Sequence, residues 1–197
     1  MDSRADTEGV VLAAGRSSRT APDCKLAFMM AGKTVLERSA GSMMPFCARV
    51  FVVTGAHEAA VASILGGWEG VTLVRNPNHA EGMYSSVKAG LRRTESGAVF
   101  VLPGDCPSVT AEVYEAMLAT AGGIVLPVYK GRSGHPVLLR RPAILELLGD
   151  GTYGSLREFI AARCPARVVV GCPGILADID TKGACRRALR LLPDGGA

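Results

Sequence analysis

Short apolar runs alternate along the chain with segments in which apolar residues recur at helical spacing. Several runs are continuous and rich in valine, which is typical of strands buried on both faces. The predicted strands are Gly9–Ala13, Arg49–Thr54, Val71–Arg75, Ala98–Leu102, Gly123–Pro127, Pro136–Arg140 and Arg167–Val170. The predicted helices are Thr34–Met44, His57–Leu65, Tyr84–Arg93, Ala111–Ala121, Pro142–Leu148, Ser155–Ala162 and Lys182–Leu192. This alternation predicts an α/β fold, a three-layer sandwich in which helices cover both faces of a mostly parallel central sheet.

Length and composition predict one soluble domain over residues 1–197. Hydrophobic residues make up 48% of the 197, which is enough for one substantial core. We expect residues 1–8 and 193–197 to be flexible ends. No apolar run is long enough to cross a membrane and no secretory signal is present, so we expect a cytoplasmic protein. The six cysteines should then stay reduced, and the lack of a C-x-x-C pair argues against a zinc site.

The charge of the chain favours a small anionic ligand over a nucleic acid. The net charge is +4, and aromatic residues make up only 5% of the chain. Nucleic-acid-binding domains usually carry a basic stripe interleaved with aromatic residues, whereas the cations are scattered here. A local cluster of cations is therefore better explained by a small phosphate-bearing molecule.

The first predicted strand leads into a loop rich in glycine, hydroxyl groups and cations. Residues Val10–Arg19 read Val-Val-Leu-Ala-Ala-Gly-Arg-Ser-Ser-Arg, and Lys25 follows. Gly15 permits a backbone conformation in which successive N–H groups bind an anion. Arg19 can bind phosphate oxygens with its planar fork, and Lys25 adds a point charge. The loop predicts a phosphate site rather than a solvated surface turn.

Two segments of the sequence carry carboxylates that could bind a metal ion. Asp105 ends another apolar strand, and ligands of parallel sheets bind at the carboxyl ends of strands. Mg²⁺ takes one or two carboxylates together with phosphate oxygens, so Asp105 is a candidate ligand; the alternative is a turn that satisfies only local backbone. Asp178 and Asp180 share one face if their segment is extended, and one could complete the site. Asp180 could also cap the last helix.

Two further glycine turns carry candidate ligand contacts. Gly82 precedes a predicted helix in which Ser85 or Ser86 could cap the helix, contact a ligand or do both. Gly134 leads into a strand, and His135 beside it could meet an anionic acceptor; the alternative is a purely structural histidine. Phosphate-binding cations and a strand-end carboxylate together suggest nucleotidyl transfer.

Two segments imitate nucleotide-binding motifs without their structural context. Residues 27–34 resemble a P-loop, but the residues inside it are bulky and no separate strand precedes it. We expect a turn at Gly32 and a helix cap at Thr34 instead. Residues 149–154 match G-x-G-x-x-G, but they follow a predicted helix, so we expect a turn before Ser155 caps the next helix.

Taken in order, the motifs resemble those of the molybdenum cofactor nucleotidylyltransferases, and among them the cytidylyltransferases most closely. The matching pieces, which span nearly the whole chain, are Leu12-Ala13-Ala14-Gly15 with Arg19, Lys25-Leu26, Gly82-Met83 with Ser85-Ser86, Gly104-Asp105-Cys106-Pro107, Gly134-His135-Pro136-Val137 and Asp178-Ile179-Asp180-Thr181.

The resemblance implies a Rossmann-like fold and transfer of CMP from CTP to the terminal phosphate of molybdopterin. It also implies Mg²⁺, with Mn²⁺ as an alternative ion, and a recipient molybdoenzyme of the xanthine dehydrogenase type. By resemblance, Lys25, Arg19 and Asp105 are catalytic, Asp105 and Asp180 hold the metal, and His135 faces the acceptor. The implied nucleotide-binding residues are Leu12, Ala13, Ala14, Gly15, Arg19, Lys25, Gly82, Ser85, Ser86 and Asp105.

The choice of base depends on one residue. Related guanylyltransferases tend to have Leu-Ala-Gly-Gly where this chain has Leu-Ala-Ala-Gly. The methyl group of Ala14 takes room that a larger purine would need. We therefore expect CTP, and use of GTP is the alternative.

The chain departs from the family pattern at two places. Thr20-Ala21 stands where Met-Gly is usual, and Lys182-Gly183-Ala184 stands where Pro-Glu-Asp is usual. Two alternatives to molybdopterin cytidylyl transfer stay open. One is transfer to a sugar or polyol phosphate. The other is a non-catalytic escort of the molybdenum cofactor, in which these departures mark a decayed site.

Overall fold

The computed structural model describes residues 6–16, 24–149 and 151–189. Its strands are β1 (Thr7–Ala13), β2 (Met29–Met30), β3 (Lys33–Thr34), β4 (Arg49–Thr54), β5 (Val71–Arg75), β6 (Ala98–Pro103), β7 (Ile124–Tyr129), β8 (Arg132–Ser133), β9 (Val137–Arg140) and β10 (Ala166–Val169). Its α-helices are α1 (Val35–Met43), α2 (Glu58–Leu65), α3 (Met83–Leu91), α4 (Ala111–Ala119), α5 (Arg141–Gly149), α6 (Leu156–Ala161) and α7 (Lys182–Ala188). Each strand and helix predicted from the sequence is present, with its ends shifted by a few residues.

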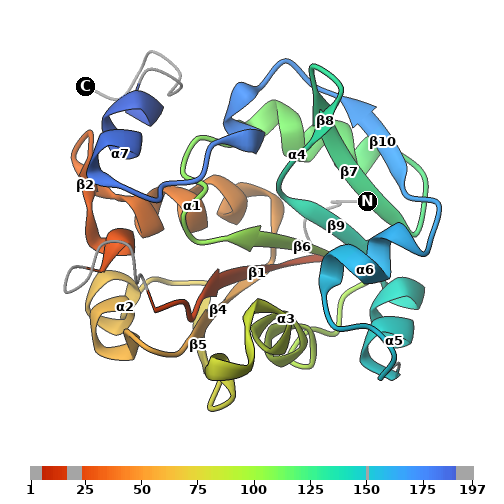
Figure 1. The fold of residues 1–197 in the computed structure, drawn as a ribbon, viewed down its shortest axis with the longest axis horizontal. Coiled ribbons are helices and arrows are strands. Elements are labelled where there is room, and N and C mark those ends of the chain that lie inside the picture. The colour runs from red at the N-terminus through yellow and green to blue at the C-terminus, as the bar shows by residue number, and fades with distance from the viewer. Residues whose placement is uncertain (1–5, 17–23, 150, 190–197) are drawn as a thin grey trace.

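Helices cover both faces of the central sheet (Figure 1). Helices α1, α2 and α4 pack on one face, and α3, α5 and α6 pack on the other. Successive side chains of a strand point to opposite faces of the sheet, and each face has its own hydrophobic core. In β4, Val52 packs in the core beneath α1, α2 and α4 and Val53 in the core beneath α3, α5 and α6, and neither is exposed. The continuous apolar runs are therefore strands buried on both faces. The predicted three-layer α/β fold is confirmed.

The sheet is mostly parallel, with one strand reversed inside it. Its order is β10-β7-β9-β6-β1-β4-β5, and β8 pairs with β7. β1 lies between β4 and β6 and is parallel to both, whereas β9 is antiparallel to β6 and β7. The reversal follows from a tight turn directly after β7, in which Lys130 and Gly131 have φ angles of 47° and 77°.

The segment that imitates a P-loop is a small hairpin. β2 and β3 pair antiparallel, and Ala31 and Gly32 form the turn with φ angles of 47° and 77°. Thr34 then caps α1, because its hydroxyl accepts from the Glu37 N–H at 3.1 Å while the Glu37 carboxylate accepts from the Thr34 N–H at 2.6 Å. The expected turn and cap are confirmed, but the two strands were not predicted.

The predicted flexible end at residues 1–8 is wrong at its C-terminal side. Thr7 and Glu8 belong to β1 and are only 2% and 3% exposed. Residues 1–5 and the predicted end 193–197 lie outside the described residues. Within the described ranges, no helix combines the length and the hydropathy that crossing a bilayer requires.

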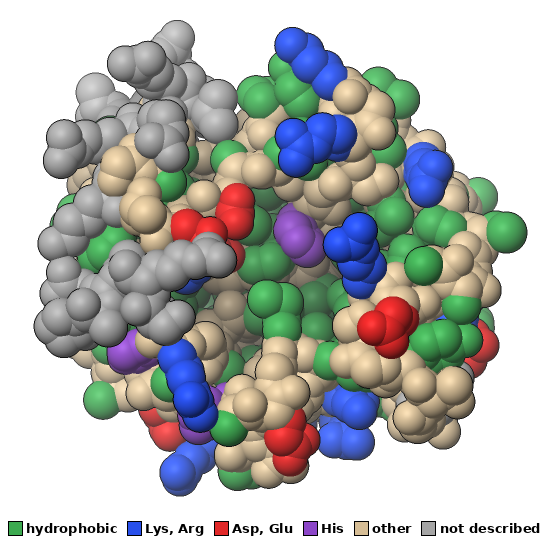
Figure 2. Space-filling view, in the orientation of Figure 1, with side chains coloured by type: hydrophobic (Ala, Val, Ile, Leu, Met, Phe, Trp, Pro, Cys, Tyr) green, Lys and Arg blue, Asp and Glu red, His purple; other side chains and the backbone are tan. Residues whose placement is uncertain are grey.

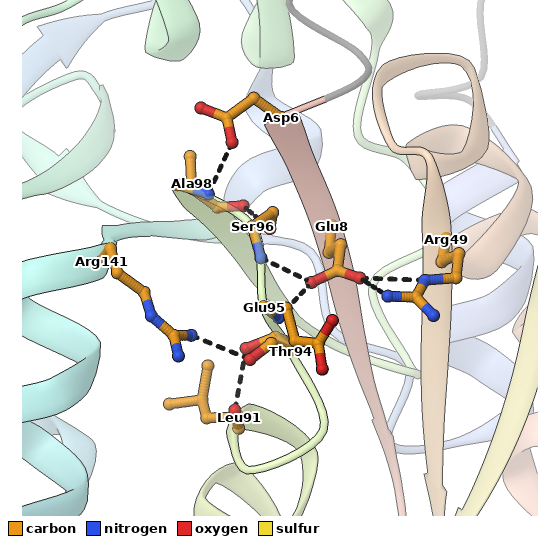
Figure 3. Close-up of polar contacts among 10 residues, drawn as sticks. Asp6, Glu8, Arg49, Leu91, Thr94, Glu95, Ser96, Ala98 and Arg141 are labelled. Atoms are coloured by element: carbon orange, nitrogen blue, oxygen red, sulfur yellow. Dashed lines mark hydrogen bonds and ion pairs between the residues drawn. The ribbon is translucent and has the colours of Figure 1, made fainter.

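A buried carboxylate anchors the amino end of β1 (Figure 3). The Glu8 carboxylate accepts hydrogen bonds from the N–H groups of Glu95 at 2.7 Å and Ser96 at 3.1 Å, and it pairs with Arg49 at 2.8 Å. Burial acts to raise the pKa of Glu8, but the hydrogen bonds outweigh burial and hold the pKa below its ordinary value. The start of β4 and the loop before β6 are thereby tied to β1.

Replacing Glu8 by Gln should weaken this anchor at neutral pH and matter less in acid. A carboxylate with a lowered folded-state pKa adds stability above its unfolded pKa, and that stability is lost as the pH falls through the folded value. We expect Glu8→Gln to lower the free energy of unfolding at neutral pH by about 1–3 kcal/mol. The difference from wild type should shrink toward about pH 3. Urea titrations at both pH values measure it, with the exposed Glu115→Gln as control; a difference that does not change with pH contradicts the assignment.

Candidate active site at the carboxyl ends of the central strands

The glycine loop and Asp105 meet because their strands are neighbours. β1 and β6 are parallel, with Leu12 opposite Pro103, and the Gly104 N–H donates to the Leu12 carbonyl at 2.9 Å. Both segments therefore leave the sheet at the same edge. The buried hydroxyl of Ser39 on α1 lies 2.9 Å from the Gly104 carbonyl oxygen and holds the turn from the helix side.

A third segment brings Asp180 to the same edge. The Ile179 N–H donates to the Asp105 carbonyl at 2.9 Å, and the Ile179 side chain is fully buried against the β2–β3 hairpin and the start of α1. Thr181 rather than Asp180 caps α7, because the Thr181 hydroxyl accepts from the Ala184 N–H at 3.0 Å. The described contacts therefore assign the cap to Thr181 and bring Asp180 to Lys25 instead.

Lys25 joins the two acids. It lies in a short 3-10 helix, η2 (Lys25–Ala27), and its ammonium is 2.5 Å from the Asp105 carboxylate and 2.9 Å from the Asp180 carboxylate. Burial acts to lower the pKa of Lys25, but the two carboxylates outweigh burial and raise it, so the ammonium stays protonated at neutral pH. The Lys25 side chain is 19% exposed, which leaves it accessible to a ligand.

The two carboxylates beside Lys25 have the chemistry to hold a divalent cation. In the part of the chain that the structure describes, no three acidic, histidine or cysteine side chains gather as a complete metal cage. Asp105 and Asp180 nevertheless converge on one positive charge, the ammonium of Lys25. Mg²⁺ in nucleotide enzymes is held by one or two carboxylates and completes its shell with phosphate oxygens and water. The donor set fits such an ion better than a structural metal.

A cleft of about 490 Å³ lies beside these three groups. The sequence-predicted residues that line it are Leu12, Ala13, Ala14, Gly15, Lys25, Gly82, Ser86, Asp105 and Asp180. Arg16 and His79 also line it, although neither was predicted to belong to the site. Ser85 does not line the cleft, and Arg19 lies outside the described residues.

Asn76 organises the far wall of this first cleft. Its side-chain amide donates to the hydroxyls of Ser85 and Ser86, both at 2.9 Å. The Ser85 hydroxyl lies 2.8 Å from the carbonyl oxygen of Gly82, whose φ of 106° strongly favours glycine. Neither serine caps α3. Ser86 lines the cleft, whereas Ser85 holds the loop in place; direct contact of Ser85 with a nucleotide stays a prediction.

A second cleft, of about 820 Å³, adjoins the first. The residues that line both clefts are Leu12, Met83, Pro103 and Asp105. His135 and Asp178 line only the second, whereas Asp180 lines only the first. Asp178 and Asp180 thus line different clefts, and of the two only Asp180 reaches Lys25 among the described contacts.

His135 presents an unsatisfied ring nitrogen. Its Nδ1 is buried and has no hydrogen-bond partner among the described residues. Burial lowers the pKa of His135 although Asp105 and Asp178 act to raise it, so the imidazole is neutral at neutral pH. The backbone N–H of His135 donates to the Ile175 carbonyl at 2.8 Å, which fixes the backbone beside the cleft. A buried polar atom without a partner is costly, so this nitrogen is suited to a ligand.

Several residues around the second cleft were missed by sequence reasoning. Arg132 and Arg157 line it from distant parts of the chain, and Met83, which is 65% exposed, stands between the two clefts. Figure 2 shows a hollow on this face with hydrophobic side chains in its floor and acidic, basic and histidine side chains around it. Cations that are far apart in the sequence cannot be recognised as a cluster from the sequence alone. Only the fold shows that they line one cleft.

Comparison with known proteins identifies the family. The MobA-like NTP transferase domain matches residues 9–168. The chain belongs to this family. It is 27% identical over 173 residues to the molybdenum cofactor cytidylyltransferase of Escherichia coli (strain K12), a match that covers 87% of the chain and 90% of that relative. The resemblance inferred from the motifs is confirmed, and the protein is a nucleotidyltransferase.

Solved structures share the fold of this MobA-like protein. A nucleotidyl transferase from Methanothermobacter (Mth528) superimposes with a TM-score of 0.81 at 22% identity, covering 93% of this chain and 96% of the other. Rv0371c of Mycobacterium tuberculosis H37Rv, solved in complex with manganese, gives a TM-score of 0.72 at 23% identity, covering 94% of this chain and 98% of the other.

Removing the Lys25 ammonium should leave two carboxylates without their shared counter-ion. We expect Lys25→Met to lower the free energy of unfolding by about 1–3 kcal/mol. Mg²⁺ or Mn²⁺ without nucleotide should stabilise this variant more than wild type, because the cation can then take the place of the ammonium. Thermal melts with and without the ion measure the difference, and Lys33→Met, which removes an exposed lysine of β3, is the control. Equal responses of wild type and Lys25→Met would count against a shared cation site.

Proposed function

We propose that the protein transfers CMP from CTP to the terminal phosphate of molybdopterin, giving molybdopterin cytosine dinucleotide and pyrophosphate. The observation that carries the proposal is the meeting of Lys25, Asp105 and Asp180 beside a glycine-loop cleft, with Asp105 also lining a second cleft that reaches His135. The identity of the E. coli relative supports the choice of nucleotide and acceptor.

The smaller cleft suits the nucleotide. Lys25 keeps its proton because of its raised pKa, and it can exchange a carboxylate contact for phosphate oxygens. Gly15 and Arg16 bring backbone N–H groups and a second cation to the same cleft. Arg19 stays a proposed phosphate ligand from its place in the motif, and Ser86 is a proposed nucleotide contact.

The two carboxylates near Lys25 would suit a divalent cation that accompanies the nucleotide. Magnesium, or manganese in its place, neutralises phosphate charge when bound, and Asp105 with Asp180 would hold it. The manganese complex of Rv0371c supports a divalent ion in a protein of this fold. The chain itself supplies the two carboxylates and the ammonium that balances them.

The larger cleft suits a phosphate ester with a flat ring system whose faces can pack on aliphatic side chains. Aliphatic side chains make up much of its lining: Leu12, Val87, Val101, Leu126, Val137, Ile160 and Ile175. A sugar or polyol phosphate would call for polar partners along its whole length, whereas a pterin can pack its ring faces on aliphatic groups. The unsatisfied Nδ1 of His135 offers one hydrogen bond to such an acceptor.

The transfer needs little acid–base chemistry. A terminal phosphate is already an ionised nucleophile, so the obstacle is repulsion between anions and the charge that develops on pyrophosphate. Holding both substrates over Asp105 removes the cost of bringing them together, and the Lys25 ammonium stabilises the developing charge. The protein's own residues therefore act mainly by positioning and electrostatics.

The proposal extends to the setting of the reaction. None of the six cysteines, all of which lie in the described residues, forms a disulfide, which agrees with a reducing cytoplasm. The product would then pass to a recipient molybdoenzyme of the xanthine dehydrogenase type. The match to a family of enzymes favours catalysis over the escort alternative, and release of pyrophosphate from CTP and molybdopterin distinguishes the two.

Asp105→Ala should reduce turnover by about two orders of magnitude or more, because the proposed metal ligand and the partner of Lys25 are lost together. Pyrophosphate release with CTP, molybdopterin and Mg²⁺ measures turnover, and circular dichroism checks that the variant is folded. The exposed Glu69→Gln, which removes a carboxylate away from both clefts, is the control. Near-normal turnover of Asp105→Ala would refute the metal assignment.

Ala14→Gly should relax the choice of base. Removing the methyl group makes room in the first cleft, so the ratio of kcat/KM for CTP to that for GTP should fall by about tenfold. Competition assays with CTP, GTP and ATP measure the ratio, and the KM of the acceptor should stay unchanged. A clear preference of the wild-type enzyme for GTP would refute the assignment to CTP.

A further inference from the structure

Two arginines face the second cleft without partners. Arg132 lines it from β8 and Arg157 from the first turn of α6. Among the described residues, neither guanidinium has a hydrogen bond or an ion pair. Some other arginines are paired, as Arg49 is with Glu8 and Arg163 with Glu146. Positive charge in the cleft is therefore available to a ligand rather than used for stability.

The backbone fixes where Arg132 can reach. Lys130 and Gly131 form the tight turn after β7, and Arg132 is registered directly opposite Tyr129 in the β7–β8 ladder. Two residues later, the Gly134 N–H donates to the Pro127 carbonyl at 3.0 Å. Arg132 thus lies in a segment whose backbone is held at both ends, and it lines the same cleft as His135.

A local arrangement keeps Arg157 unneutralised. The carboxylate nearest to it in sequence, Glu158, accepts a hydrogen bond from the Gly154 N–H at 3.0 Å. The Glu158 N–H is itself bonded to the Ser155 hydroxyl at 3.1 Å, so the turn before α6 is fixed. The Glu158 carboxylate is thus bonded within its own turn, and Arg157, an exposed residue, lines the second cleft without an ion-pair partner among the described residues.

The charges of the cleft match a phosphate monoester better than a neutral ligand. Asp105 and Asp178 line the same cleft as the two arginines, yet neither pairs with them among the described contacts. A guanidinium fork matches the oxygens of a phosphate dianion, and two forks can share one such group. The unsatisfied Nδ1 of His135 provides a further contact in the same cleft.

We propose that Arg132 and Arg157 together bind the phosphomonoester group of the acceptor, with His135 as a third contact. This inference rests on the proposed function and names the residues that position its nucleophile. One oxygen of the bound phosphate forms a bond to the α-phosphorus of the nucleotide. The bond from that phosphorus to the bridging oxygen breaks, pyrophosphate leaves with the electron pair, and no proton is transferred.

The test measures binding with a probe that does not depend on the identity of the acceptor. Phenyl phosphate combines a phosphomonoester with a flat apolar ring, and its binding is measured by calorimetry on protein saturated with α,β-methylene-CTP and Mg²⁺. We expect Arg132→Gln/Arg157→Gln to weaken phenyl phosphate binding by about tenfold or more. The affinity for the CTP analogue should change by less than about twofold, because the arginines lie outside the first cleft. Arg167→Gln, which removes an exposed arginine of β10, is the matched control.

The possible outcomes distinguish a failure of the arginine assignment from a failure of the proposed function. Equal binding of phenyl phosphate by wild type and the double variant overturns the arginine assignment, as does failure of wild type to bind it. A loss of CTP-analogue affinity equal to the loss of phenyl phosphate affinity also overturns it, since the effect would then be general. If wild type binds phenyl phosphate through the arginines but forms no product from CTP and molybdopterin, the proposed acceptor is wrong while the phosphate site stands.

Discussion

The site depends on one ammonium shared by two carboxylates. Lys25 contacts acids that lie 80 and 155 residues further along the chain, so a single side chain holds together the segments after β1, after β6 and before α7. Two carboxylates that contact the same ammonium would repel each other without a cation between them. The charge is therefore part of the architecture before any ligand binds. Because only 19% of the Lys25 side chain is exposed, the charge is also screened less by water than a surface pair would be.

Much of the fold could be predicted because the strands carry a strong pattern. Valine-rich runs such as Val50–Val53 have to be buried on both faces, which requires helices above and below them. The pattern does not specify direction, however, and nothing in the apolar run Val137–Leu139 reveals that β9 runs against its neighbours. That reversal comes from the tight turn at Lys130. The β2–β3 hairpin was missed because two-residue strands are too short to show alternation.

The candidate site was predictable where chemistry follows a strand end. Gly15 and Asp105 follow β1 and β6, and parallel neighbours necessarily release their loops at one edge. The sequence did not predict the places of those site residues whose positions depend on tertiary contacts. The sequence does not reveal which of Asp178 and Asp180 reaches Lys25. That depends on the buried Ile179 between them, whose backbone N–H donates to the Asp105 carbonyl. The part that Ser85 plays in holding its loop was not visible either, because its partner Asn76 comes from the end of another strand, β5.

The wall common to the two clefts has a consequence for the end of the catalytic cycle. Under the proposed function, a dinucleotide made by joining one substrate from each cleft would occupy both clefts at once, across Met83 and Asp105. It would be retained by two sets of contacts joined by one covalent link, which would slow its escape relative to either substrate alone. Release of the product, rather than bond formation, would then limit the rate. A protein that accepts the product directly would relieve that delay by opening one cleft at a time.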